Sequence, residues 1–236
     1  MKLNNNLISR MRFNILMAES TNLSRIAYDQ ILNSIITGNI KLGSPVSQNA
    51  FSKILPMSRT PVREALFALE HQGLLTKDGN KYSVSFISKE DIIQLYEVRK
   101  ILEGNAARLC AEKINTSQKK SLSFLMKTMK MKSESRDASP EEIANLNGHL
   151  HEMIADIAGN AYLKKFIEET LLHLKIVRIS LLVSVERRTD EFKDHKQIIE
   201  AILDSDPKKA QEAMERHEDA VLDFARKTAF KKLYVE

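Results

Sequence analysis

Apolar residues recur at spacings of three and four along most of this chain, which is the pattern of amphipathic helices. The first such segment begins at Thr21 or Asn22 and ends at Gly38, a residue type that commonly closes a helix. Its predicted buried stripe comprises Ile26, Ala27, Ile31 and Ile35. We therefore expect a helix over residues 21–37.

A shorter helix is predicted next. Gly43–Pro45 has the composition of a turn, and Ser47 can then cap a helix that continues to Leu55. Pro56 ends this helix because proline cannot continue the backbone hydrogen-bond ladder.

A third helix is predicted from Thr60, an N-cap residue, with Pro61 at the first helical position, where its missing N–H costs nothing. Gly73 suits the position just past its end. The predicted buried face comprises Val62, Ala65, Leu66 and Leu69. Arg59 and Arg63 are four residues apart, so they project together from the first turn, away from most of that face.

Two short β-like runs, Leu74–Thr76 and Tyr82–Val84, follow the third helix. Asp78-Gly79 between them is a strong hairpin turn signal. Three helices and a hairpin, with two arginines at the start of the third helix, predict a winged helix-turn-helix that enters the major groove of DNA.

The pattern changes at Ser88, which begins a capping box with Asp91. Beyond it the chain is expected to be all helix, which predicts a bundle of six to seven helices. The predicted helices cover residues 89–113, 117–134, 140–158, 161–184, 187–204 and 207–230. The chain is thus mainly α, with an arm at 1–20, a winged domain at 21–87 and a helical domain at 88–236.

The composition indicates in which cellular compartment the protein is expected. Cys110 is the only cysteine, so no disulfide can form within the chain, and a reducing compartment such as the cytoplasm is expected. No apolar run approaches 18 residues, so no membrane span is expected. Residues 1–20 are basic and too weakly apolar for a signal peptide, which predicts a flexible arm. Met17 offers an alternative start within it.

The net charge of +5 is unevenly distributed. Residues 1–87 hold 10 Lys and Arg against 5 Asp and Glu, whereas residues 88–236 hold 26 of each kind. The whole excess therefore belongs to the predicted winged domain, as expected if that part binds a polyanion and the rest does not.

Polar residues interrupt the apolar stripes of the helical domain. Arg99 lies among apolar residues of the first long helix, and a buried guanidinium must be paired. One explanation is an internal ion pair with Glu103 or with an acid on a facing helix. The other is a ligand carboxylate, which arginine binds with two parallel hydrogen bonds. The sequence leaves both open.

Three histidines show the same anomaly, each on a different predicted helix. His195 and His217 lie within apolar stripes, and His151 shares its face with Asn147, one turn before it. A single inward histidine is usually a core residue. Three from separate helices, beside an amide oxygen, indicate a metal site.

The segment Ser58–Leu66 resembles the core of the GntR family of bacterial transcription regulators, and residues 36–43 and 69–75 match the same pattern. The resemblance implies that Arg59 and Arg63 contact guanines or phosphates, and that Ser58 and Thr60 contact the DNA backbone. The family usually has Glu-Arg in the second helix, where this chain has Gln48-Asn49 as candidate contacts.

The wing also departs from the family, which usually carries Arg-Gly there. This chain reads Asp78–Lys81, so Lys81 is expected to supply the charge of the wing. Phe67 continues the face of Arg59 and Arg63 by four residues. It either contacts a thymine methyl group or packs against a neighbouring helix.

The helical domain resembles the FCD effector-binding domain of the FadR-type subfamily. Matching segments are Val98–Glu103, Asn147–His151, Ala158–Asn160, Asp194-His195 and Arg216-His217. The resemblance implies a divalent metal, zinc or nickel, bound next to a pocket for a small organic acid. The implied metal ligands are Asn147, His151, His195 and His217, and the candidate effector contacts are Arg99 and His149.

The combined prediction is a bacterial, nucleoid-associated transcription regulator that is dimeric through its helical domain and binds a pseudo-palindromic operator. Family logic favours a repressor that an organic acid releases from DNA. One alternative is a metal-dependent enzyme with Glu152 or Glu103 as the general base. Another is a non-specific architectural DNA-binding protein. A permanently bound structural zinc is the alternative for the metal.

Overall fold

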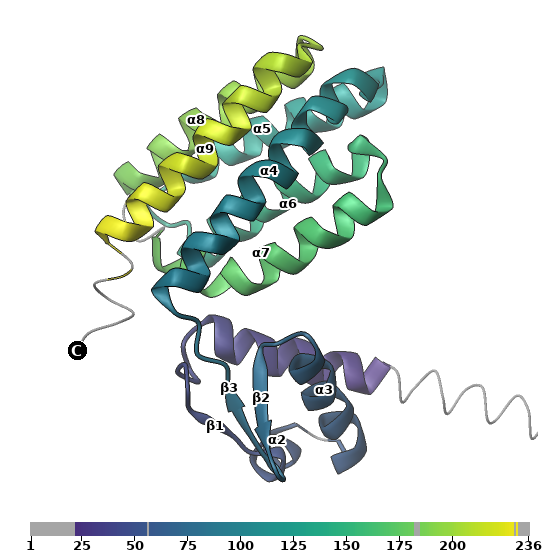
Figure 1. The fold of residues 1–236 in the computed structure, drawn as a ribbon, viewed down its shortest axis with the longest axis vertical. Helices are drawn as coiled ribbons and strands as arrows, with labels where there is room; N and C mark the ends of the chain where they lie inside the picture. Colours follow the sequence, from purple (N-terminus) through teal and green to yellow (C-terminus); the bar gives the residue numbers. More distant parts are fainter. Residues whose placement is uncertain (1–21, 56, 182–184, 229, 231–236) are drawn as a thin grey trace, which may run out of the picture. The chain divides into compact units, whose positions relative to one another are not determined.

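The computed structural model describes residues 22–55, 57–181, 185–228 and 230 (Figure 1). The arm predicted at residues 1–20 lies outside this part of the chain. The chain divides into two compact units, Met1–Phe86 and Ile87–Glu236. The second unit begins one residue before Ser88, the N-cap of the capping box.

The first unit contains a helix over residues 22–36, followed by α2 (Gln48–Ile54) and α3 (Arg59–His71). The first of these helices ends as expected, with Gly38 at a φ of +76°. Its core residues Ala27, Ile31 and Ile35 are buried, but Ile26 is 41% exposed. The prediction for Ile26 was wrong because one residue along a helix is a turn of about 100°, which carries it off the buried stripe.

The start of α3 differs from the prediction by two residues. Ser58, not Thr60, is the N-cap, with extended backbone angles, and Arg59 is the first helical residue. Pro61 therefore occupies the third position of the helix. The backbone N–H groups of the first turn have no partner within a helix, so proline is tolerated there as well as at the first position.

Within the described residues of the first unit, the sheet has three strands in the order β1-β3-β2. β2 (Leu75–Asp78) and β3 (Lys81–Val84) form the predicted antiparallel hairpin, with Asp78 opposite Lys81 and Gly79 at a φ of +55°. β1 (Pro45–Val46) pairs with the other edge of β3. This two-residue strand lies partly within the turn predicted at Gly43–Pro45.

The second unit is a bundle of six described helices (Figure 1). They are α4 (Lys89–Lys113), α5 (Thr116–Glu134), α6 (Pro140–Ala158), α7 (Ala161–Leu181), α8 (Val185–Leu203) and α9 (Pro207–Lys227). The expected signals begin several of them: capping boxes at Ser88 and Ser139, and the Asp206 cap of α9. The main core joins α4, α5, α6, α7, α8 and α9 through buried Leu, Ile, Ala and Met.

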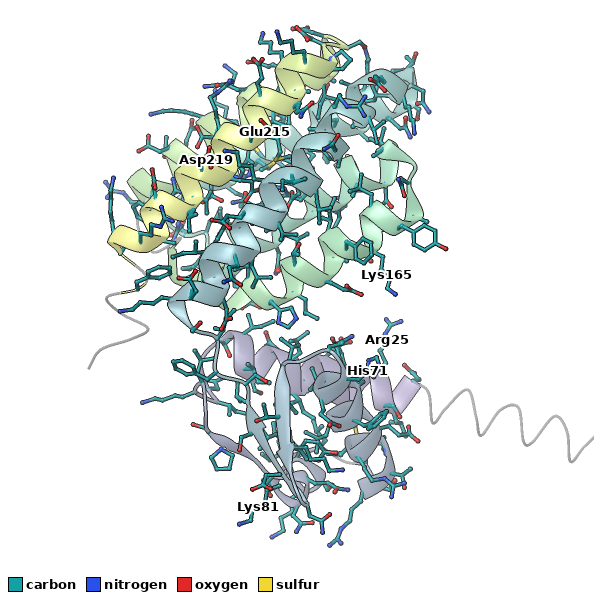
Figure 2. The ribbon with its side chains drawn as sticks, viewed as in Figure 1. Arg25, His71, Lys81, Lys165, Glu215 and Asp219 are labelled. Carbon is teal, nitrogen blue, oxygen red and sulfur yellow. The ribbon has the colours of Figure 1, made fainter. Side chains whose placement is uncertain are left out.

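Helix α4 is the centre of the bundle, because it packs against α6, α7, α8 and α9. It lies close to α9 at Gly104, where an added Cβ would lie 2.9 Å from the Cγ of Glu215. Glu215 and Asp219 lie along α9 beside α4 (Figure 2), and Asp219 pairs with Lys100 of α4 at 2.6 Å. The Lys100–Asp219 pair thus joins α4 and α9 at the exposed side of their contact.

A search for membrane-spanning helices among the described residues finds none of sufficient length and apolarity.

Candidate metal centre and nucleic-acid interface

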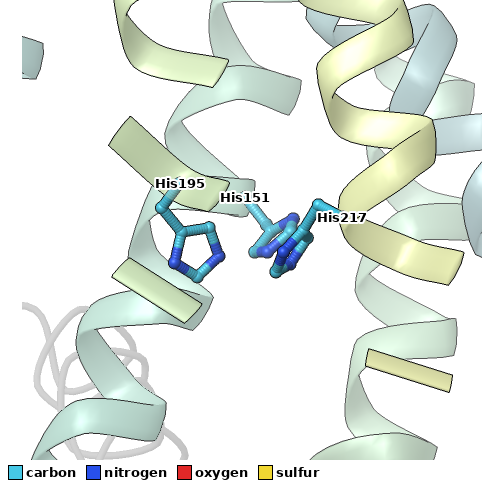
Figure 3. Close-up of side chains that lie close together, drawn as sticks. All are labelled: His151, His195 and His217. Atoms are coloured by element: carbon cyan, nitrogen blue, oxygen red, sulfur yellow. The ribbon is translucent and has the colours of Figure 1, made fainter. Parts of the chain in front are cut away.

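Three imidazole rings meet inside the bundle. His151 comes from α6, His195 from α8 and His217 from α9, and their exposed fractions are 1%, 0% and 2% (Figure 3). The ring centroids of His195 and His217 lie 4.3 Å apart, and that of His151 lies 5.5 Å from each. The three inward histidines inferred from the stripes therefore lie together.

The donor set fits a divalent metal of the zinc type. One ligand atom from each of the three histidines lies within 4.8 Å of the others. Zinc takes imidazole nitrogens at about 2.0–2.1 Å from the ion, so nitrogens around a tetrahedral ion lie roughly 3.3 Å from one another, which is within this limit. Neutral imidazole suits zinc and nickel, and three protein ligands leave coordination positions for a further group.

Asn147 lies one turn before His151 on α6 and is buried, with 4% of its surface exposed. Its side-chain Nδ2 donates a hydrogen bond of 2.9 Å to Oε1 of Glu191 on α8. The amide nitrogen is therefore committed to Glu191, and the amide oxygen is the atom of Asn147 that can bind a metal.

Arg99 is buried and held by two carboxylates. Its Nη2 lies 2.6 Å from Oε1 of Glu103 on α4 and 2.9 Å from Oε1 of Glu218 on α9. Burial alone would lower the pKa of Arg99, but the charges of Glu103 and Glu218 raise it above its ordinary value. The contacts are those of the internal ion pair considered from the sequence.

Each of these two carboxylates also lies next to one of the three histidines. Glu103 contacts Nδ1 of His151 directly, and an oxygen of Glu218 lies 4.0 Å from Nε2 of His217. Burial alone would raise the pKa of Glu103, but Arg99 and His151 hold it far below its ordinary value. The histidine cluster thus adjoins a buried network of one cation and two anions.

The charge of this network favours a cation at the histidines. Glu103 and Glu218 contact a single guanidinium, that of Arg99, so these three side chains together carry one negative charge. This charge would attract a divalent ion bound among neutral histidines. The side chains present therefore fit a metal both as ligands and in charge.

Two features of the centre depart from what the sequence led us to expect. His149, a candidate effector contact, is exposed on α6 and lies outside the histidine cluster. Glu218 was not anticipated, although it shares the buried face of α9 with Met214 and Leu222, four residues on either side. An acidic residue within the apolar stripe of this helix was the sequence signal that could have identified Glu218.

The candidate nucleic-acid interface is at the start of α3. Arg59 and Arg63 are both exposed, as are Ser58 and Thr60. The opposite face of the helix is buried through Val62, Ala65, Leu66 and Leu69. Tertiary packing thus fixes the helix and leaves the two guanidinium groups directed to solvent, where they are available to base edges or phosphates.

A groove of about 310 Å³ lies between the start of α2 and the wing, lined by Gln48, Asn49 and Lys81 among others. Gln48 donates from Nε2 to the backbone oxygen of Arg59 at 3.1 Å, so it fixes α2 against α3. Lys81 is at the end of the hairpin (Figure 2). Phe67 is 60% exposed, which argues against its packing beneath a neighbouring helix.

Comparison with known protein families decides the class of the protein. The model of bacterial regulatory proteins of the gntR family matches residues 23–81, and the FCD domain model matches residues 94–220. The chain belongs to the GntR family. It is an FCD-containing transcription regulator rather than an enzyme, which removes the alternative of a metal-dependent enzyme.

Two similar proteins are named as transcription regulators. The chain is 32% identical over 208 residues to the regulator LutR of Bacillus subtilis, covering 78% of this chain and 92% of LutR. It is 28% identical over 198 residues to a probable D-xylose utilization operon transcriptional repressor of Paenarthrobacter nicotinovorans, covering 82% and 84%. The structure of McbR/YncC from E. coli shares the fold, with a TM-score of 0.74 at 20% identity over 85% of this chain and 97% of that one.

Proposed function

We propose that this GntR-family regulator is a metal-containing repressor whose affinity for its operator is controlled by a small organic acid. In this proposal two copies of the chain associate through their helical domains and present two α3 helices to a pseudo-palindromic site. Repression is supported by the relative from Paenarthrobacter, which is named as an operon repressor.

The DNA-binding part of the proposal rests on the exposed Arg59 and Arg63 at the start of α3. Arginine pairs with the O6 and N7 atoms of guanine through two hydrogen bonds, and each such pair contributes about 1–3 kcal/mol of discrimination. The DNA phosphate backbone on either side of these bases would then be contacted by Ser58, Thr60, Asn49 and Lys81.

The metal part rests on a single observation, the convergence of three buried imidazoles from α6, α8 and α9. His151, His195 and His217 would hold zinc or nickel together with the amide oxygen of Asn147. The bound ion would supply Lewis-acid positions for the oxygens of a carboxylate. The amide is neutral, so affinity for the metal should be lower than with a carboxylate at that position.

We assign the effector carboxylate to the metal rather than to Arg99. Glu103 and Glu218 already occupy the guanidinium of Arg99, so an effector would have to displace one of them to bind there. An acid that binds the ion more tightly in one arrangement of the helices than in another would shift the population toward that arrangement.

The first experiment measures the metal content of the purified protein and of a His195→Ala/His217→Ala double variant. About one metal per chain in the parent and none in the variant is the expected result. His149→Ala is the matched control, because this histidine is exposed on the same helix as His151 and should leave the metal content unchanged. A parent that takes up neither zinc nor nickel would contradict the metal centre.

The operator part is tested separately with duplexes selected from a random pool. A sequence preference that is lost in Arg59→Ala and Arg63→Ala supports recognition by α3. Binding that falls steeply with salt and is indifferent to sequence would instead indicate an architectural DNA-binding protein. Release of the duplex by small carboxylates only in the metal-loaded parent would support the effector.

A further inference from the structure

Among the residues that the structure describes, two groups of side chains able to bind cations overlap in the bundle. One is His151, His195 and His217, and the other is Glu103, His151 and Glu218. The second group already has a cation, because the guanidinium of Arg99 contacts both of its carboxylates. His151 is the residue common to both groups. What Glu103 does to His151 therefore bears directly on the metal centre.

The contact between Glu103 and His151 determines where the proton of the imidazole lies. Glu103 presents Oε1 to Arg99 and Oε2 to Nδ1 of His151. A carboxylate held by a guanidinium accepts hydrogen bonds, and a neutral imidazole has one N–H to donate. The proton therefore belongs on Nδ1, and the lone pair that can bind a metal belongs on Nε2.

We infer that Glu103 is a positioning residue of the metal centre: it fixes His151 in the tautomer protonated on Nδ1, while Arg99 holds Glu103 in place. This inference rests on the proposed metal site. A carboxylate that accepts the second N–H of a metal-bound histidine fixes the ring orientation and makes the ligand more basic. Helix α4 thus contributes to the centre without supplying a metal ligand.

A neighbouring ion pair shows what a purely structural role would look like. Arg108 and Glu112 lie on the same helix with the same spacing of four residues and an N–O distance of 2.6 Å. Their side chains are 36% and 40% exposed, whereas those of Arg99 and Glu103 are 1% and 2% exposed. Glu112 is therefore a matched control for Glu103 in the same helix.

Substitution of Glu103 by glutamine makes a specific prediction about the tautomer. Arg99 can only donate hydrogen bonds, so the amide oxygen of the new side chain must face Arg99 and its NH₂ group must face His151. The amide then donates to Nδ1, and the imidazole proton moves to Nε2, the atom required by the metal. A lost structural contact alone would not move this proton.

The first test measures zinc affinity by competition with a chromophoric chelator, on the full chain. Glu103→Gln should weaken zinc binding 10–100-fold, the usual effect of removing an outer-shell partner, and Glu112→Gln should stay within twofold of the parent. An affinity of Glu103→Gln within twofold of the parent would overturn the inference while leaving the metal centre intact.

The second test determines the tautomer in the parent protein, so it does not depend on the folding of a Glu103 variant. Nitrogen chemical shifts of the histidine rings in the zinc-loaded parent should show His151 protonated on Nδ1 and bound to zinc through Nε2, the peak being assigned by its loss in His151→Gln. The opposite tautomer would overturn the inference. A parent that binds no zinc would overturn the proposed metal centre as well, so the two failures are distinguishable.

Discussion

The two functional regions of this protein use charged and polar side chains in opposite ways. At the start of α3, Arg59 and Arg63 are exposed on a helix whose other face is buried. At the candidate metal centre, Arg99 and the three histidines are buried, and Arg99 is held by two carboxylates. The first region can lose a functional side chain without losing its fold, whereas in the second region binding and stability depend on the same contacts.

The largest expected effect comes from breaking the buried network. Arg99→Met keeps much of the side-chain volume but leaves Glu103 and Glu218 as two buried carboxylates without their cation. We expect the free energy of unfolding of the metal-free chain to fall by about 3–5 kcal/mol. Arg108→Met, which breaks the exposed pair on the same helix, should cost under about 1 kcal/mol. Urea unfolding followed by circular dichroism measures both, and equal losses would contradict the comparison.

The next largest effect is the stabilisation of the folded chain by a bound metal ion. An ion that binds only the folded state at a free concentration 100-fold above its Kd should stabilise it by about 2.7 kcal/mol. Zinc should therefore raise the unfolding midpoint of the parent and of His149→Ala. It should leave that of His195→Ala/His217→Ala unchanged. A zinc-induced shift that persists in the double variant would place the ion elsewhere.

A smaller effect is expected at the exposed arginines. Arg59→Ala and Arg63→Ala should each weaken binding to a selected operator by about 1–3 kcal/mol if they contact bases. Neither should alter the unfolding midpoint, because both side chains are exposed. Lys165→Ala removes a charge of the helical domain that is 68% exposed, and serves as the control in fluorescence anisotropy at fixed salt. Unchanged affinity in both arginine variants would exclude α3 as the recognition helix.

The smallest expected effect concerns Phe67, which is 60% exposed on α3. If its ring contacts a thymine methyl group, replacing that thymine by uracil should weaken operator binding by about 0.8 kcal/mol, the value for burying one CH₂ group. The parent should show this cost at one base of the operator, and Phe67→Ala should not. An equal response of both proteins at every thymine would remove Phe67 from base recognition.

Most of the fold could be predicted from local sequence. Helices α4 and α6 have the predicted bounds, because capping boxes and strict apolar spacing are local features. The start of α3 was misplaced from Ser58 to Thr60, since two adjacent residue types can cap a helix and proline fits several first-turn positions. Strand β1 was missed because two residues carry no period, and its pairing with β3 is set by the tertiary fold.

The same distinction applies to the candidate site. The inward histidines were visible because each one interrupts an apolar stripe on its own helix. The partners of Arg99 were only partly visible: Glu103 is one turn away on the same helix, but Glu218 comes from α9. Its contact with Arg99 depends on the packing of α9 against α4, which no local pattern specifies.

The origin of the three histidines on three helices has a further consequence. An ion bound by α6, α8 and α9 would act as a crosslink between segments that are distant in the chain, in the way that a disulfide does. Such a link restricts the unfolded chain by closing long loops, and the entropy of closure grows only slowly with loop length. Unlike a disulfide, it needs no oxidising environment, in a chain whose only cysteine is buried. Chelation would then reopen it within an intact polypeptide.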